Sequence, residues 1–206
     1  MFSFLDKLKI HPKLRIVFNG HPALRAKSAP IAEITDDIRQ LGRQLTSALL
    51  NSEVKGVGLA APQVGINKRM IVLDTCPPGG RIRQDASPGE LLLEPRMPLV
   101  LVNPEIIDHS ITCETCNEGC LSLPGVSGDV TRPDCVVLKA QTLDGELITV
   151  ECRGLLCRCL QHEIDHLDGK LFYDYLNDED KKKASVVMKQ LEKMEKAKLA
   201  KGTSDA

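Results

Sequence analysis

The residues with the clearest chemical potential form the segment His162-Glu163-Ile164-Asp165-His166. On a helix, residues four positions apart lie one above the other, so His162 and His166 can offer two imidazoles to one metal ion. Glu163 lies one position round the helix, close enough to reach a water bound to that ion. This spacing predicts a divalent metal site with a general base beside it.

The alternative is that the two histidines simply share the surface of an amphipathic helix. The leucines around them argue against this, because they predict that the helix is buried, and buried imidazoles need a partner. These residues are Leu155, Leu156, Leu160 and Leu167.

A catalytic metal needs three protein ligands and one open position. The longer histidine motif of some metallopeptidases is excluded as a source of the third ligand, because its third histidine would fall on Phe172. A glutamate from the next helix, Glu179 or Glu192, stays open and would leave Cys120 a free thiol. The other source is Cys120 itself, where the preceding glycine leaves room around a thiolate and Glu118 is placed to orient its neighbours.

Two other classes of metal site use the same cysteine. In a structural zinc module, Cys113, Cys116, Cys120 and one histidine would close a four-coordinate site, but a closed site has no use for Glu163. An electron-transfer copper site is disfavoured, because both histidines lie on one helix and no methionine stands near Cys120.

The segment 56–65, Gly-Val-Gly-Leu-Ala-Ala-Pro-Gln-Val-Gly, is rich in small residues that let the backbone approach another group closely. A nucleotide-binding loop is strongly disfavoured, because the third glycine and the lysine of such loops are missing and no β-α-β pattern surrounds the segment. Gln63 is the side chain here that can donate hydrogen bonds, although an exposed turn glutamine is the alternative.

Length and composition indicate a single domain. The chain has 206 residues, is 42% hydrophobic and lacks Trp, so its core must be aliphatic. The net charge of −1 gives no reason to expect nucleic-acid specificity. Met1 to Ile10 resembles neither a signal peptide nor a membrane span, and no later run is long enough to cross a membrane. We therefore expect a cytoplasmic protein, in which its eight cysteines are buried thiols or metal ligands rather than disulfides.

Periodicity and turn residues outline the elements that must position these groups. A helix capped by Thr35 is expected up to the residues before Gly56, and prolines and glycines from Cys76 to Pro98 predict a long surface loop. Strands are expected at 70–74, at 99–103 with an end at Pro104, and at 136–143 and 147–150 as a hairpin around Asp144-Gly145. Because no crossover helices alternate with these strands, we expect antiparallel sheets and the α+β class.

Two more helices are expected towards the C-terminus. The helix that begins at Gly154 and carries the histidines should stop at Gly169. The last helix should run from about Asp178 to Leu199, with an apolar stripe and a lysine-rich face for which solvation is the simpler explanation. The stripe consists of Ala184, Val187, Met188, Leu191 and Met194. We expect one catalytic domain, with a core at 11–176, the helix at 177–200 and a disordered tail at 201–206.

Three motifs in this order resemble those of peptide deformylase. They lie at 56–63, 118–122 and 162–166, and Gly169-Lys170-Leu171-Phe172 also looks like that family. The resemblance covers nearly the whole chain from His11. It implies a deformylase-like fold of antiparallel sheets around a central metal-binding helix, with one N-terminal and one C-terminal helix, and it implies removal of the formyl group from the formylmethionine of nascent proteins, with release of formate.

The resemblance also implies roles for individual residues. Fe(II), replaceable by Zn(II), Ni(II) or Co(II), would be bound by one thiolate and two imidazoles, here Cys120, His162 and His166. Glu163 would take a proton from water and pass it to the leaving amine. The side-chain amide of Gln63 and the backbone N–H of Leu121 would meet the oxyanion.

The substrate peptide would lie as an added strand between two segments of the chain. One is Val57, Gly58 and Leu59, and the other is Glu118, Gly119 and Leu121. Val57, Leu155 and Cys159 would line the pocket for the methionine side chain.

Three positions depart from the family pattern. Cys116 and Arg158 stand where aliphatic pocket residues are more usual, and Ser127 stands near where many relatives place an arginine. Partners implied by the resemblance are N-formylmethionyl nascent peptides and the ribosome, the latter through the C-terminal helix.

Overall fold

The computed structural model describes residues 13–76 and 85–202. The expectations for Met1 to Ile10 and for the last tail residues, 203–206, therefore fall outside the described residues. No helix in the described part of the chain is both long and apolar enough to span a bilayer.

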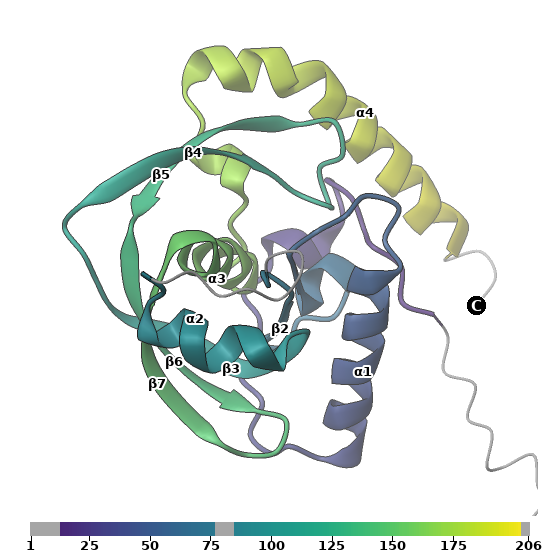
Figure 1. Cartoon of the computed structure of the whole chain (residues 1–206). Coiled ribbons are helices and arrows are strands. Elements are labelled where there is room, and N and C mark those ends of the chain that lie inside the picture. The colour runs from purple at the N-terminus through teal and green to yellow at the C-terminus, as the bar shows by residue number, and fades with distance from the viewer. Residues whose placement is uncertain (1–12, 77–84, 203–206) are drawn as a thin grey trace, which may run out of the picture.

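Two antiparallel sheets surround one central helix (Figure 1). The five-stranded sheet has the order β1-β2-β3-β6-β7, and the two-stranded sheet consists of β4 and β5. The strands are β1 Gly58–Ala60, β2 Met70–Leu73, β3 Leu99–His109, β4 Cys113–Gly119, β5 Ser127–Pro133, β6 Cys135–Thr142 and β7 Leu147–Arg153. The α+β class and the antiparallel pairing are confirmed.

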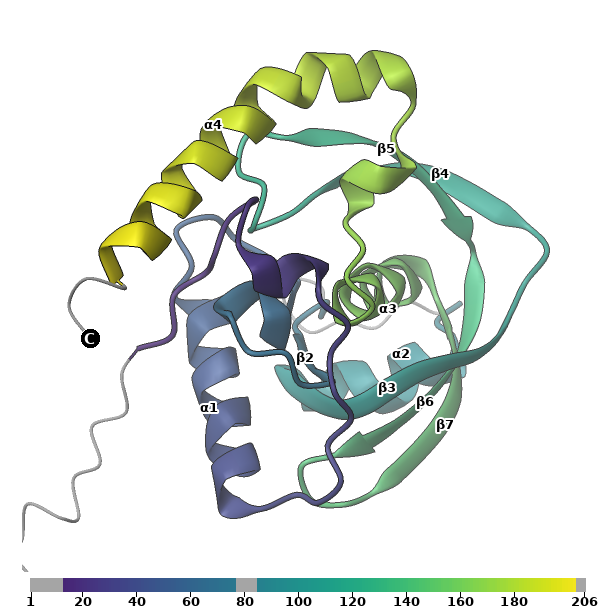
Figure 2. The same cartoon turned by 180° about the vertical axis from the view of Figure 1, so that it is seen from behind.

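Four α-helices accompany the sheets in the described residues. They are α1 Asp36–Leu50, α2 Pro88–Leu93, α3 Gly154–Leu167 and α4 Asp178–Gly202. Short 3-10 helices lie at η2 Pro22–Arg25, η3 Ala61–Val64, η4 Glu94–Arg96 and η5 Phe172–Tyr175. Figure 1 looks down α3 in the centre, and Figure 2 shows α4 along the outer side of β5 from behind.

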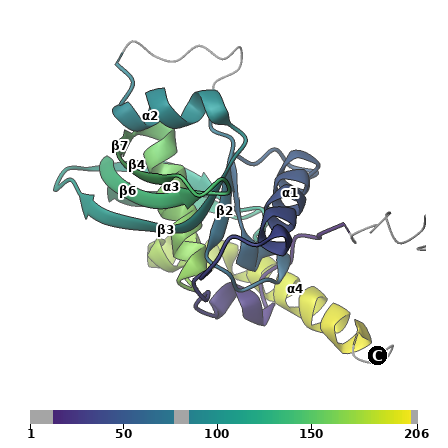
Figure 3. The same cartoon turned by 90° about the horizontal axis from the view of Figure 1, so that it is seen from below.

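Helix α1 covers one face of the five-stranded sheet, as Figure 3 shows from below. The Thr35 side chain accepts a hydrogen bond from Ile38 N–H and caps the first turn, as expected. The buried stripe of α1 packs on β2 and β3 through Leu41, Leu45 and Leu49. Helix α3 packs against strands of the same sheet in a second apolar cluster, so the sheet holds α3 in place.

The C-terminal helix is part of the folded core. Ala184, Met188 and Leu191 are buried in a cluster with Leu123 and Phe172, whereas Met194, expected in the same stripe, is exposed. The helix continues through Gly202, two residues beyond the expected end at 200. Removing α4 would therefore expose apolar surface.

Two expectations about the strands and loops were wrong. The segment from Cys76 to Pro98 is not all loop, because Ser87 caps helix α2 and forms a reciprocal capping box with Glu90. Strand β3 does not end at Pro104 but continues to His109. A register shift between Val102 and Glu105, with Asn103 at a φ of 49°, forms a bulge that accommodates the missing N–H of proline.

Candidate metal centre

Helix α3 brings the histidine motif into the interior. Leu156, Leu160 and Leu167 are buried as expected, but Leu155 is 52% exposed and does not belong to the apolar face. Gly169, at a φ of 74°, ends the helix region, and a Cβ there would fall 2.7 Å from the backbone oxygen of Arg25. The left-handed φ ends the helix, and the close approach to Arg25 leaves no room for a side chain at this position.

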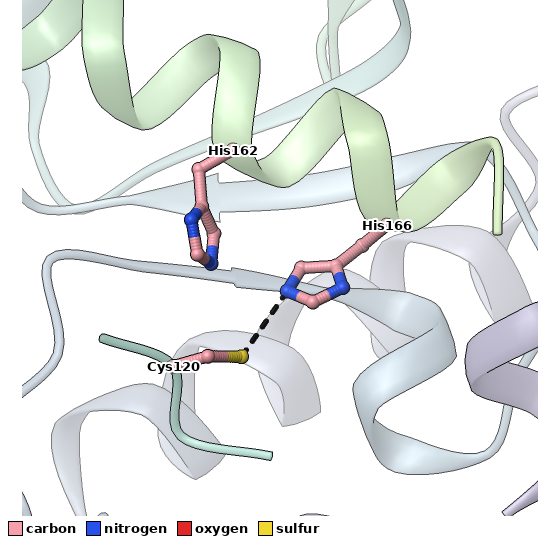
Figure 4. A group of neighbouring side chains, drawn as sticks. All are labelled: Cys120, His162 and His166. Atoms are coloured by element: carbon pink, nitrogen blue, oxygen red, sulfur yellow. Dashed lines mark hydrogen bonds between the residues drawn. The ribbon is translucent and has the colours of Figure 1, made fainter. Parts of the chain in front are cut away.

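His162 and His166 project from α3 towards Cys120, which follows the end of β4 (Figure 4). One ligand atom from each of the three residues lies within 4.8 Å of the other two. The Sγ atom of Cys120 is 3.3 Å from Nε2 of His166. Among the described residues this is the one His/Cys/Asp/Glu group with such geometry.

Glu118 fixes the orientation of His162. Its Oε2 atom lies 2.9 Å from Nδ1 of His162, and because a carboxylate can only accept, Nδ1 carries the proton and Nε2 is left as the ligand atom. Arg132 donates to both oxygens of Glu118, from Nε at 2.6 Å and from Nη2 at 3.0 Å. Burial alone would raise the pKa of Glu118, but these hydrogen bonds from His162 and Arg132 lower it to about 2, so the carboxylate stays ionised.

The two imidazoles sit in different electrostatic surroundings. Burial, together with the charges of His162 and Arg132, holds the pKa of His166 well below its usual value, which favours the neutral ligand form. Burial also disfavours a charged His162, but its hydrogen bonds to Cys120 and Glu118 raise its pKa to about 10. A metal ion at Nε2 competes with that proton, so metal binding at this site releases a proton.

Glu163 is buried beside the ligand group. Burial, reinforced by the charge of Glu118, raises its pKa to about 7 against the opposing effects of His162 and Arg132. Within the described structure its Oε2 atom has no hydrogen-bond partner, so one oxygen is available to accept a proton. A Cβ at Gly58 would fall 2.5 Å from Glu163 Oε1 and 2.6 Å from Cys159 Sγ. A glycine at position 58 therefore lets β1 approach α3 closely enough to hold Glu163.

Gln63 is buried, so the exposed-turn alternative was wrong. Its Oε1 atom accepts the Ala60 N–H at 2.8 Å, which forces the amide nitrogen to the opposite side. That nitrogen donates to Cys120 Sγ at 3.4 Å and to Ser122 Oγ at 3.3 Å. The side chain thus presents N–H groups to the metal-ligand cluster.

The segments expected to cradle a peptide lie at sheet edges. Strand β1, with Gly58 and Leu59, is the outer strand of the five-stranded sheet, and β4, with Glu118 and Gly119, pairs only with β5 among the described strands. Each strand therefore has an edge that another strand can join. Leu121 follows the ligand Cys120, and its side chain packs near Gly56.

The expected pocket residues differ in exposure. Val57 is exposed like Leu155, whereas Cys159 is buried and its Sγ donates to the Val57 carbonyl at 3.5 Å. Burial and the charge of Glu163 raise the pKa of Cys159 well above its usual value, so it is a neutral thiol. Arg158 is occupied by hydrogen bonds to Glu118 and to two backbone carbonyls.

The rival ligand sets do not assemble in the described part of the chain. Cys113 and Cys116 lie along β4, and Glu179 and Glu192 lie on α4, outside the ligand group. Phe172, which occupies the place of a third histidine in the longer motif, stacks on the ring of His162 with centroids 6.1 Å apart.

Three residues of the site were missed from the sequence. Arg132 links Glu118 to Asp165, whose Oδ2 lies 2.8 Å from Arg132 Nη1. Tyr175 donates to Asp165 Oδ1 at 2.9 Å. Gly128, Val130 and Arg132 share the inward face of β5, but a glycine and an arginine among these positions leave no apolar alternation by which the sequence could mark the arginine.

The donor set suits a divalent transition metal. One sulfur and two imidazole nitrogens match the three protein ligands of a catalytic site, which leaves a position for water or substrate. A histidine that binds a metal through one ring nitrogen usually donates a hydrogen bond from the other, and His162 donates this bond to Glu118. A Cys/His/His centre beside a buried glutamate defines a metal-dependent hydrolase.

Comparison with known proteins narrows this class of protein to one family. Residues 13–182 match the model of the polypeptide deformylase family. Peptide deformylase 2 of Gloeobacter violaceus is 45% identical over 163 residues, which is 79% of each chain. The peptide deformylase of Alkalilimnicola ehrlichii is 40% identical over 181 residues, 88% of this chain and 90% of that one. A plant peptide deformylase crystal structure superposes with a TM-score of 0.76 at 31% identity, covering 93% of this chain and 95% of the other.

The chain belongs to the polypeptide deformylase family. Its activity is that of a deformylase, a hydrolase that removes N-formyl groups from nascent peptides.

Proposed function

We propose that Cys120, His162 and His166 hold one Fe(II) ion and that Glu163 acts as the general base. The observation that carries this proposal is the convergence of the three ligand atoms within 4.8 Å of one another beside a buried carboxylate. Zn(II), Ni(II) and Co(II) fit the same donor set. When bound, such an ion lowers the pKa of water from about 16 towards about 7 and polarises the formyl carbonyl.

Glu163 moves the proton. With its pKa raised to about 7, the carboxylate accepts a proton from the attacking water at neutral pH and, once protonated, can return it to the leaving amine. Its unpartnered Oε2 atom is the acceptor in this proposal. Gly58 leaves room for the other oxygen, because a Cβ at that position would fall 2.5 Å from Oε1.

Gln63 and Leu121 stabilise the oxyanion in this scheme. The amide of Gln63 is held by Ala60 N–H with its own N–H groups directed at the ligand cluster, so it needs no reorientation during the reaction. The backbone N–H of Leu121, next to the ligand Cys120, supplies the second donor.

The peptide binds in an extended form between β1 and the end of β4. Val57, Gly58 and Leu59 pair with one side of it, and Glu118 and Gly119 flank the other. Val57, Leu155 and Cys159 receive the methionine side chain, and the exposed Val57 and Leu155 lie at the open side of that pocket.

An anaerobic assay of Fe(II)- or Ni(II)-loaded protein on formylmethionyl peptides tests this function. The loaded wild-type protein should release formate, and Glu163→Gln should bind the same amount of metal but lose most of the rate. Absence of formate release from the metal-replete wild type would refute the proposal. Thiol titration adds a check, since a metal-bound Cys120 is protected, whereas a glutamate-ligated peptidase would leave it reactive.

We also propose that the protein works in the cytoplasm and contacts the ribosome through α4. Exposed lysines along this helix support an electrostatic contact with an anionic surface; they are Lys182, Lys183, Lys189, Lys193, Lys196, Lys198 and Lys201. Deleting the helix is a poor test, because its other face is buried in the core. The test is co-sedimentation with ribosomes of the double variant Lys189→Glu/Lys193→Glu and of the wild type, with the two proteins matched in deformylase activity. Unchanged co-sedimentation of the variant would refute a ribosome contact through the lysines of α4.

A further inference from the structure

We propose that Arg158 is a positioning residue that sets the distance between the Cys120 thiolate and the two histidines. This inference rests on the ligand set of the proposed function. It follows from how the two halves of the site are joined, because Cys120 belongs to the β4–β5 hairpin and the histidines belong to α3.

The hairpin is not tied to the main sheet by strand pairing. Strands β4 and β5 form their own two-stranded sheet, separate from the five-stranded sheet that holds α3. An isolated two-stranded hairpin is only marginally stable in water. Its placement against α3 therefore depends on side chains that reach across.

Arg158 reaches both strands of the hairpin from one position on α3. Its Nη1 atom donates to Glu118 Oε1 at 2.7 Å and to the Val130 carbonyl at 3.0 Å. Its Nη2 atom donates to the Glu114 carbonyl at 2.8 Å. Glu114 and Glu118 lie on β4 and Val130 on β5, so one guanidinium connects three elements.

The same contacts stabilise the carboxylate that orients His162. Oε1 of Glu118 accepts from Arg132 Nε and Arg158 Nη1, while Oε2 accepts from Arg132 Nη2 and His162 Nδ1. The side chain of Arg158 is 13% exposed and that of Glu118 is 5% exposed, so little water competes for these contacts. Arg158 also lies one helical turn before His162, on the same face of α3.

The planar fork of the guanidinium is essential to this role. Three acceptors on two strands need donors in a fixed arrangement, which a lysine ammonium cannot reproduce. The charge of Arg158 acts in the opposite direction, because a cation near the site repels a divalent ion. If Arg158 positions the ligands, its replacement by methionine weakens metal binding. If only its charge acts, the same replacement leaves binding equal or makes it tighter.

Co(II) binding to the full-length protein provides the test. We would measure the dissociation constant by chelator competition and record the visible and thiolate charge-transfer absorption for the wild type, Arg158→Met and Arg158→Lys. If Arg158 positions the ligands, both variants bind Co(II) about 10–100-fold more weakly and show shifted bands. Arg96→Met, which breaks the exposed ion pair with Glu146, is the matched control and should behave as the wild type.

Three results would overturn the inference. Wild-type Co(II) affinity and an unchanged spectrum in Arg158→Lys would show that a positive charge at this position is enough and that the guanidinium fork is not needed. Equal or tighter binding in Arg158→Met would show that metal affinity does not need the guanidinium contacts. A lower Tm of the metal-free variants with an unchanged spectrum would indicate a purely structural contact. If Arg158→Met does not fold, Arg158→Lys carries the comparison.

Cys120→Ser separates this inference from the proposed function. Retention of Co(II) by Cys120→Ser would refute the ligand set itself. Loss of Co(II) from Cys120→Ser, together with normal binding by both Arg158 variants, would refute only the role of Arg158.

Discussion

The carboxylate of Glu118 accepts a hydrogen bond from Nδ1–H of His162 at 2.9 Å, so the residue two positions before Cys120 in sequence orients a ligand on another element. Glu118, which orients His162, and Cys120, which supplies the thiolate, thus come from one short segment. Any movement of the end of β4 changes both at once.

Glu118→Gln should weaken metal binding by about 10–100-fold, as is typical when a partner of a ligand histidine is altered. The amide can still accept from His162, but the charge that holds Arg132 and Arg158 is lost. Chelator competition measures the effect. Glu114→Gln, which changes an exposed side chain of the same strand, is the control and should bind metal normally.

Gly58→Ala should reduce kcat by about tenfold or more while metal stays bound, because small displacements of catalytic groups are costly. A Cβ at this position would lie 2.5 Å from Glu163 Oε1, so either the carboxylate or β1 must move. Gly119→Ala is the informative comparison, since the nearest atom there is Val126 O at 3.6 Å. Comparable metal content with equal kcat in Gly58→Ala would show that β1 does not position Glu163.

Gln63→Met should lower kcat by about 10²–10³-fold, as for the loss of one oxyanion donor. It should also destabilise the fold by about 1–3 kcal/mol, because the buried Ala60 N–H loses its acceptor. Steady-state kinetics and thermal unfolding separate the two effects. Ser122→Ala removes the other contact of the Gln63 amide and should leave kcat near the wild-type value; a similar loss there would shift the role to the serine.

Removing the metal should lower the Tm, because a ligand that binds only the folded state stabilises it by about 2.7 kcal/mol at a free concentration 100 times the Kd. Adding Co(II) to the metal-free protein should raise the Tm again. Cys120→Ser should lose this response, and Cys113→Ser should keep it, since Cys113 lies outside the ligand group. The reverse pattern would favour the structural zinc module.

Regular patterns made much of the fold predictable. The helix capped by Thr35 and the hairpin around Asp144-Gly145 follow local rules of capping and turn chemistry. The His162 and His166 pair was visible because a helix turns their spacing into a shared face. Cys120 and Gln63 were placed by resemblance, since no local rule joins segments so far apart.

The β4–β5 hairpin escaped prediction for a physical reason. Strand β4 is mostly exposed and polar, and the inward positions of β5 are Gly128, Val130 and Arg132. A strand that turns an arginine inwards has no apolar alternation to detect. The bulge at Asn103 similarly hid the continuation of β3 past Pro104.

Cys120 and His166 are 46 residues apart in the sequence yet only 3.3 Å apart at Sγ and Nε2. A metal bound by both closes a long loop in the chain, as a covalent cross-link does, and the entropy of closing such a loop grows only slowly with its length. The ion therefore restricts the unfolded chain if it stays attached during partial opening. During synthesis this closure must wait until α3 has been made, so the protein acquires its metal only when most of its sequence has been translated.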